Sequence, residues 1–210
     1  MADFNTLAEA IIAGDQIGAK AAAEELIAGG STAGDVLEKG LVAGMNVVGA
    51  KFKANEFYIP EVLLAARAMK GAMEVLRPLL AETGVKPVAK IAVGTVKGDQ
   101  HDIGKNIVAM MMEGAGFEVT DLGINVGPDK FVEQAREGAR ILLMSALLTT
   151  TMPAMKANIE ALKAAGLRDK VLVMVGGAPV TQAFADEIGA DGYSDDAASA
   201  VEKARELLGL

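Results

Sequence analysis

The chain has 210 residues, and 51% of them are hydrophobic, which is enough to build a sizeable aliphatic core. Its formal net charge of −8 argues against nucleic acid or an anionic membrane surface as a partner, because neither attracts an acidic protein. The absence of cysteine excludes disulfides, thiolate metal sites and iron–sulfur clusters. No signal-peptide pattern opens the sequence and no apolar stretch reaches about 18 residues, which predicts a soluble cytoplasmic protein.

Residues 1 to about 80 have the pattern of four amphipathic helices with short links, which favours a small antiparallel bundle. The third helix should bury an apolar stripe, and Pro60 suits the first turn of the fourth. Residues 81–87 read as a linker, so we expect a helical domain at residues 1–85. Capping residues are expected at Asp3, Asp15 and Ser31 or Thr32, and the stripe comprises Leu37, Leu41, Met45, Val48 and Phe52.

From residue 88 onward, five strand-like segments alternate with helical ones. Such alternation predicts a parallel, doubly wound, flavodoxin-like sheet, here at residues 86–210. Ligands of these sheets bind at the carboxyl ends of the strands. The predicted strands are 91–96, 117–122, 140–145, 170–175 and 190–193, and the predicted helices are 103–116, 128–138, 151–166, 180–188 and 197–208.

The loop after the first predicted strand, residues 98–104, carries His101, which is the single histidine of the chain. It has too few glycines and too many acids for a phosphate loop. Asp99 could accept the Nδ1 hydrogen of His101 and leave Nε2 free to bind a metal, while Gly104 would let a bulky ligand approach. A surface histidine beside a solvated acid is the ordinary alternative. One protein imidazole suffices as a metal ligand when a macrocycle supplies the others, which leaves haem or a corrin.

Two further strand ends carry small or hydroxyl side chains: residues 145–151 and Gly176-Gly177. Each has an ordinary explanation, because Thr151 could cap a helix and two glycines could make a tight turn. Together with the histidine loop they fall on neighbouring loops of one sheet edge. There they could line a channel for a long, mostly neutral ligand arm.

These motifs, D-x-H-x-x-G at residues 99–104, S-x-L at residues 145–147 and G-G at residues 176–177, resemble the full cobalamin-binding signature. They are similar to the cobalamin module of methionine synthase and to the corrinoid proteins of methyltransferase systems. The helical half, with G-M-N-V-V-G at residues 44–49 and F-Y-I-P at residues 57–60, resembles the four-helix cap of those proteins. The resemblance covers essentially the whole chain.

The resemblance implies that His101 replaces the nucleotide base as lower cobalt ligand, in the base-off, His-on mode. Asp99 would hold His101, and Thr151 stands where methionine synthase has the serine of this relay. The rest of the first loop would line the cofactor through Gly98, Asp102 and Gly104. The nucleotide tail would be held by Ser145, Leu147, Thr149, Gly176, Gly177 and, near the C-terminus, Ala197. In the cap, Glu38 would contact the corrin, and Phe52 and Ile59 would cover the cobalt.

The resemblance further implies a corrinoid methyl carrier that is not catalytic alone, because the chain has only cap and cobalamin domain. A substrate methyltransferase would load methylcobalamin or a related corrinoid, and a second one would pass the methyl group to tetrahydrofolate or coenzyme M. A reductive activating protein is a further expected partner. Methanol, methylamines, quaternary amines and aryl methyl ethers are donors of such systems. The alternatives are a cobalamin-binding light sensor, an adenosylcobalamin mutase subunit and a binding module without cobalamin.

Overall fold

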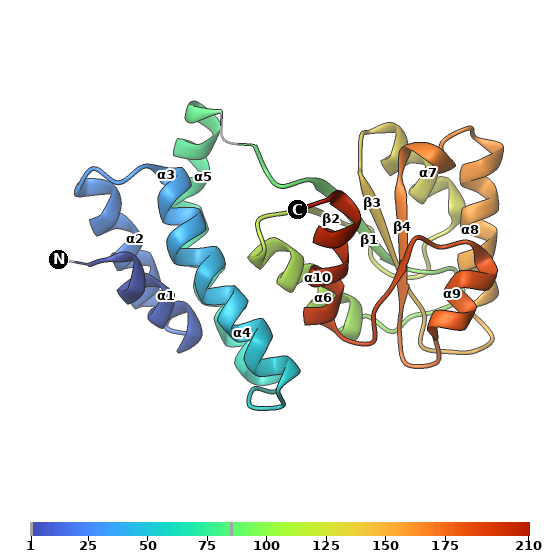
Figure 1. The fold of residues 1–210 in the computed structure, drawn as a ribbon, viewed down its shortest axis with the longest axis horizontal. Coiled ribbons are helices and arrows are strands. Elements are labelled where there is room, and N and C mark those ends of the chain that lie inside the picture. The colour runs from blue at the N-terminus through green and yellow to red at the C-terminus, as the bar shows by residue number, and fades with distance from the viewer. Residues whose placement is uncertain (1, 85) are drawn as a thin grey trace. The chain divides into compact units, whose positions relative to one another are not determined.

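A computed structural model describes residues 2–84 and 86–210 (Figure 1). The chain divides into two compact units, one comprising Met1–Val88 with Met110–Gly116 and the other Ala89–Ala109 with Phe117–Leu210. The first is helical and the second is a helix-covered parallel sheet. This architecture agrees with the predicted α/β fold with a helical N-terminal region.

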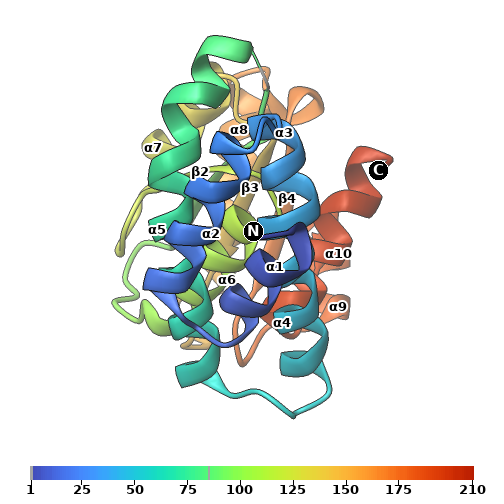
Figure 2. The same ribbon diagram turned by 90° about the vertical axis from the view of Figure 1, so that its left-hand side faces the viewer.

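The helical unit packs its helices side by side, with α2 along α5 and α1 against α2 and α4 (Figure 2). The expected capping residues begin its helices, because Asp3, Asp15 and Thr32 each accept a backbone hydrogen bond from three residues ahead. Pro60 lies in the first turn of α5, as predicted. The elements are α1 (Phe4–Ile12), α2 (Gln16–Ala28), α3 (Ala33–Asp35), the π-helical segment η1 (Val36–Val42), α4 (Ala43–Lys53) and α5 (Ile59–Thr83).

The predicted apolar stripe of the third helix is only partly right. Leu41, Met45 and Val48 are buried, but Leu37 and Phe52 are only half-buried, and Val36 is fully buried. The cause is η1, because a π-helix needs one residue more per turn than an α-helix and so shifts the buried face by one position.

The predicted linker at residues 81–87 begins too early. Helix α5 continues to Thr83 and ends at Gly84, which takes the left-handed conformation (φ 68°) usual for a glycine after a helix. The hydroxyl of Thr83 bonds back to the carbonyl of Leu79, which keeps this last turn helical. Residue 85 of the predicted linker lies outside the described residues.

Within the described residues, five strands of the second unit form one parallel sheet in the order β2-β1-β3-β4-β5, the flavodoxin-like order. Helices follow the strands in alternation. The strands are β1 (Lys90–Thr95), β2 (Glu118–Asp121), β3 (Ile141–Ser145), β4 (Leu172–Gly176) and β5 (Gly192–Tyr193), and the helices are α6 (Ile103–Gly114), α7 (Pro128–Arg136), α8 (Pro153–Ala164), the 3-10 turn η2 (Arg168–Lys170), α9 (Gln182–Ile188) and α10 (Ala197–Leu208).

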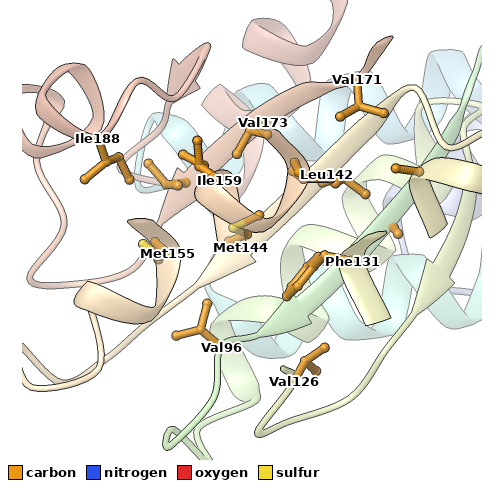
Figure 3. Close-up of a cluster of buried hydrophobic side chains, with 14 of the residues drawn as sticks. Val96, Val126, Phe131, Leu142, Met144, Met155, Ile159, Val171, Val173 and Ile188 are labelled. Carbon is orange, nitrogen blue, oxygen red and sulfur yellow. The ribbon is translucent and has the colours of Figure 1, made fainter. Parts of the chain in front are cut away.

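The sheet has helices on both faces, with α6 and α10 on one side and α7, α8 and α9 on the other (Figure 1). The face towards α7, α8 and α9 buries an aliphatic core around Phe131, Leu142 and Ile159 (Figure 3). Most predicted bounds in this unit differ from the observed ones by one or two residues. The fourth strand starts at Leu172 because η2 precedes it, and α8 starts at Pro153 because Thr151 has a different role.

Candidate functional site

The carboxyl ends of β1, β3 and β4 bring the predicted motifs to one edge of the sheet. Thr95, Ser145 and Gly176 are in register across these three neighbouring strands. The loop with Asp99 and His101 leaves the first strand there. Parallel strands all end at the same edge, which is why motifs about 50 and 75 residues away in sequence meet.

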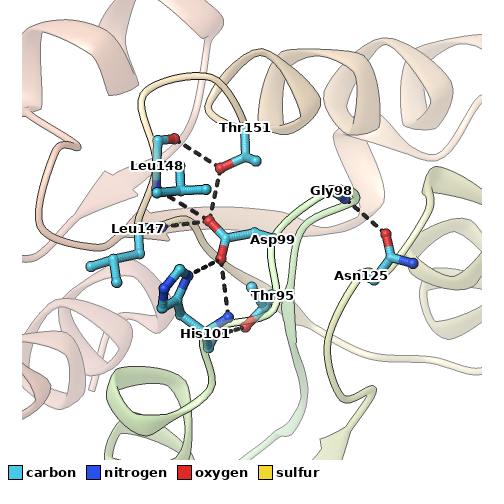
Figure 4. A network of polar contacts seen from close by, with 8 residues as sticks. All are labelled: Thr95, Gly98, Asp99, His101, Asn125, Leu147, Leu148 and Thr151. Carbon is cyan, nitrogen blue, oxygen red and sulfur yellow. Dashed lines mark hydrogen bonds and ion pairs between the residues drawn. The ribbon is translucent and has the colours of Figure 1, made fainter.

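The carboxylate of Asp99 lies at the centre of this edge and is fully buried (Figure 4). Its Oδ2 atom accepts the backbone N–H of Leu147 at 2.8 Å and that of Leu148 at 3.2 Å, and it lies 2.8 Å from the hydroxyl oxygen of Thr151. Its Oδ1 atom accepts the backbone N–H of His101 at 3.1 Å and lies 2.7 Å from Nδ1 of the same residue. The loops after β1 and β3 thus form a cradle for one carboxylate.

The cradle also explains the charge of Asp99. Burial alone would raise the pKa of its carboxyl, but the hydrogen bonds from the His101 side chain, the Leu147 amide, the His101 amide and the Thr151 hydroxyl outweigh burial. The pKa of Asp99 is therefore held well below its usual range. Asp99 is ionised at neutral pH and acts as an acceptor.

His101 is anchored on one side and open on the other. Because the ionised Asp99 can only accept, the hydrogen between them belongs to Nδ1 of His101, and the lone pair of the ring is then on Nε2. The carbonyl of His101 accepts the hydroxyl of the buried Thr95 at 2.8 Å. The side chain of His101 is nevertheless 52% exposed. This geometry presents Nε2 as a ligand that is fixed in tautomer and orientation.

Thr151 does not cap the next helix, which was its ordinary explanation from the sequence. The capping position of α8 belongs to Met152. The hydroxyl oxygen of Thr151 is instead 2.8 Å from Asp99 Oδ2 and 2.8 Å from the carbonyl oxygen of Leu148. A hydroxyl has one hydrogen, so it donates to one of these two acceptors at a time.

The two glycines after β4 have an internal reason for being glycine. A Cβ at Gly177 would collide with the carbonyl oxygen of Ala146, and the residue has a φ of 122°. A Cβ at Gly176 would lie 3.1 Å from the carbonyl oxygen of Ser194. The glycines therefore let the backbones of neighbouring strand ends approach, and space for a ligand arm stays a prediction.

The other predicted residues of this unit lie along the same edge with different exposure. Gly98, Asp102 and Gly104 are exposed in the His101 loop, and the Asp102 carboxylate accepts the side-chain amide of Asn106 at 3.2 Å. Thr149 is exposed after β3, whereas Ala197 is buried at the start of α10. Their contacts with a cofactor stay predictions.

Three predicted residues belong to the helical unit. Glu38 is exposed in η1, Phe52 is half-buried in α4, and Ile59 is the first residue of α5 and is 41% exposed. Their roles over the face of a cofactor likewise stay predictions.

Sequence reasoning missed three contributions to the site. The amides of Leu147 and Leu148 bind Asp99 through the backbone, which leaves no signal in the residue types. Thr95 holds His101 from inside the sheet. The side-chain oxygen of Asn125 accepts the backbone N–H of Gly98 at 2.8 Å, and the backbone N–H of Asn125 donates to the carbonyl of Asp99 at 3.0 Å. A polar residue at the buried end of β1 was the one signal that could have drawn attention to Thr95.

The residues present fit a large flat ligand that carries its own metal. Four apolar side chains of this edge, Ile103, Ile124, Leu147 and Leu148, are between 44% and 67% exposed. Among residues 2–84 and 86–210 no group of three or more histidine, cysteine or acidic side chains could hold a bare metal ion. An imidazole nitrogen beside exposed apolar side chains is the donor set that a corrin needs, because the macrocycle supplies the other metal ligands.

Comparison with known proteins gives the family. Residues 89–202 match a B12 binding domain model, and residues 4–77 match a second model that is also described as a B12 binding domain. The chain belongs to the B12-binding corrinoid proteins. A cobalamin is thus the cofactor of this corrinoid protein, as the sequence motifs predicted.

The relatives of the corrinoid protein span most of its length. It is 50% identical over 176 residues to dimethylamine corrinoid protein 1 of Methanosarcina acetivorans, which covers 83% of each chain. A crystal structure of a cobalamin-binding protein from Desulfitobacterium hafniense is 33% identical, with a TM-score of 0.81 and 98% of each chain covered. The methanol:cobalamin methyltransferase complex MtaBC of Methanosarcina barkeri has a chain with 28% identity and a TM-score of 0.87, covering 98% of this chain and 79% of that one.

No helix in the described part of the corrinoid protein is both long and apolar enough to cross a membrane.

Proposed function

We propose that this chain is a cytoplasmic methyl carrier that holds its corrinoid in the base-off, His-on mode, with His101 as the lower cobalt ligand. The observation that carries this proposal is the contact of 2.7 Å between Asp99 and Nδ1 of an otherwise half-exposed imidazole. When bound, the corrinoid supplies a cobalt centre that accepts and gives up a methyl group.

The protein's own groups have distinct tasks in this proposal. Nε2 of His101 would hold the metal of the corrinoid, and Asp99 would fix the ring and strengthen it as a donor. Because Asp99 is ionised, it would stay paired with His101 whether or not a metal is bound. Thr151 can move its single hydrogen between Asp99 and Leu148, which changes how much negative charge Asp99 presents to the ring. The exposed apolar side chains at this edge keep water from the ligand's lower face.

The relatives support the choice of proposed partners. One relative is a chain of the methanol:cobalamin methyltransferase complex MtaBC, and others are dimethylamine corrinoid proteins. A methyltransferase that uses a methylated amine is therefore the first loading partner to test. A second methyltransferase would pass the methyl group to tetrahydrofolate or coenzyme M. A reductive activating protein would reduce the cofactor again after it has become oxidised.

The ligation is tested by the absorbance spectrum of the purified chain mixed with hydroxocobalamin. The wild type should give a spectrum with nitrogen bound below cobalt and with the nucleotide base displaced. His101→Ala should bind weakly and give a spectrum without nitrogen ligation. An unchanged His-on spectrum in His101→Ala would refute the assignment. The matched control is Gln100→Ala, which alters the exposed neighbouring residue and should leave the spectrum unchanged.

A further inference from the structure

Lys105 is a buried charge that the proposed chemistry does not use. It lies in the first turn of α6, and its side chain is 1% exposed. Both features are unfavourable for a lysine. The amino end of a helix repels positive charge, and removal of an ammonium group from water is costly unless it is paired. Its presence therefore needs a specific reason.

The reason lies at the end of β2. The Nζ atom of Lys105 is 2.6 Å from each carboxylate oxygen of Asp121 and 2.6 Å from the side-chain oxygen of Asn106. Asp121 is the last residue of β2, and its side chain is 47% exposed. The ion pair thus joins the start of α6 to the end of the neighbouring strand.

Three further hydrogen bonds join this ion pair to His101. Oδ1 of Asp121 accepts the amide of Gly123 at 2.8 Å, and the carbonyl of Gly123 accepts the amide of Thr95 at 3.0 Å. The hydroxyl of Thr95 then donates to the carbonyl of His101 at 2.8 Å (Figure 4). The ion pair, these three hydrogen bonds and the backbone from His101 to Lys105 together form a closed ring of contacts.

Resting on the proposed function, we propose that Lys105 is a positioning residue for the cobalt ligand. Its ion pair with Asp121 closes this ring and so fixes the backbone of His101 against the end of β1. A shift of that backbone would move the imidazole away from Asp99, because the contact between them depends on a loop only two residues long. The pair would thereby set how readily the protein takes up a corrinoid in the His-on mode.

The first test uses the cofactor-free protein and measures amide hydrogen exchange. Lys105→Met keeps the length of the side chain and removes the charge. It should speed exchange at His101 and Thr95 by about 10-fold or more beyond the change in global stability, because local opening of this ring then no longer requires a charge-assisted hydrogen bond to break. Asp121→Asn is the milder variant, because its side-chain oxygen can still accept the Gly123 amide, and it should give the same pattern more weakly.

Two controls separate positioning from general stability. Ile159→Val removes one buried methylene from the core beside α8 and should change stability without a local effect at His101. Lys130→Met removes an exposed lysine that pairs with Glu133 on α7, and it should change neither measurement. If exchange at His101 rises no more in Lys105→Met than in a stability-matched Ile159→Val, the positioning role is refuted.

The second test adds hydroxocobalamin. Lys105→Met should lower the affinity for the His-on form by about 10-fold, and the effects of Lys105→Met and Asp121→Asn should not add in the double variant. Additive effects would refute the pair as the unit that acts. A wild type that fails to give the His-on spectrum would refute the proposed function, whereas the exchange measurement on the cofactor-free protein would still decide the role of the ring.

Discussion

Two regions of the same sheet edge are ordered in opposite ways. Around Asp99, donors from two loops bind a single buried charge, so the positions of both loops depend on polar contacts. Around Gly176 and Gly177 the strand ends meet backbone to backbone, and order depends on the absence of side chains. The first region can therefore be loosened in steps, by removing one donor at a time, whereas a side chain at Gly177 has no room unless the backbone moves.

The largest effect is expected from Gly177→Val. The new side chain meets the carbonyl of Ala146, and a β-branched residue strongly resists a φ of 122°. We expect a loss of about 3 kcal/mol or more in the free energy of unfolding, as for other strained backbone positions. Denaturant unfolding measures this loss. Cobalamin and cobinamide, which lacks the nucleotide, should lose affinity together, and a loss confined to cobalamin would point to a simple steric channel.

Asp99→Asn should have the next largest effect, because the new NH2 group replaces an acceptor oxygen. It would then face the N–H donors of Leu147 and Leu148 or those of His101. Each buried group left without a partner costs about 1–3 kcal/mol. Since the folded-state pKa of Asp99 is depressed, its ionised form contributes stability above the unfolded pKa of about 3.9, and that contribution is lost as pH falls towards the folded value. The difference between wild type and variant should therefore be complete at pH 7 and shrink only in acid. A difference that grows on acidification would contradict the ionised cradle.

Thr151→Val tests one donor alone. It keeps the shape of a nearly buried side chain and removes the hydroxyl, so it should cost about 1–2 kcal/mol, and Thr151→Ser should cost less because the donor remains. Thermal unfolding of the three proteins measures the order. A larger loss for serine than for valine would assign the effect to packing of the methyl group instead of the hydroxyl.

The smallest structural effect is expected from Thr149→Ala. Thr149 is exposed, so stability should change by no more than about 0.5 kcal/mol. If its hydroxyl contacts the nucleotide tail, affinity for cobalamin should fall a few-fold while affinity for cobinamide stays unchanged. Titration of both ligands checks this, and an equal fall for both would place the contact on the corrin instead.

The sequence predicted correctly those features that depend on local residue preferences. Caps such as Asp3 and Asp15, and the alternation of strands and helices, follow from local rules, and they were predicted correctly. The contact between Asp99 and His101 followed from a spacing of two residues. The donors from Leu147 and Leu148 could not be predicted, because every residue has an amide and only the tertiary fold selects which ones meet the carboxylate.

Two further misses have physical causes of the same kind. The face of the third helix shifted because a π-helical turn depends on packing rather than on residue pattern, as the close approach of Gly40 to Leu7 illustrates. The ion pair of Lys105 could not be predicted because its partner, Asp121, lies 16 residues later, at the end of β2.

The cradle around Asp99 also has a consequence for the order of events during synthesis. The hydrogen bonds to its Oδ2 atom come from residues 48 to 52 positions later in the chain. A nascent chain that has released the whole D-x-H-x-x-G motif, but not yet β3 and the loop after it, has a histidine whose partner carboxylate is still solvated. Contacts of such sequence separation form late, because loop closure must precede them. We therefore expect the cofactor to load only after β3 and the loop that follows it have left the ribosome, even though the motif that is diagnostic for it is translated about 50 residues earlier.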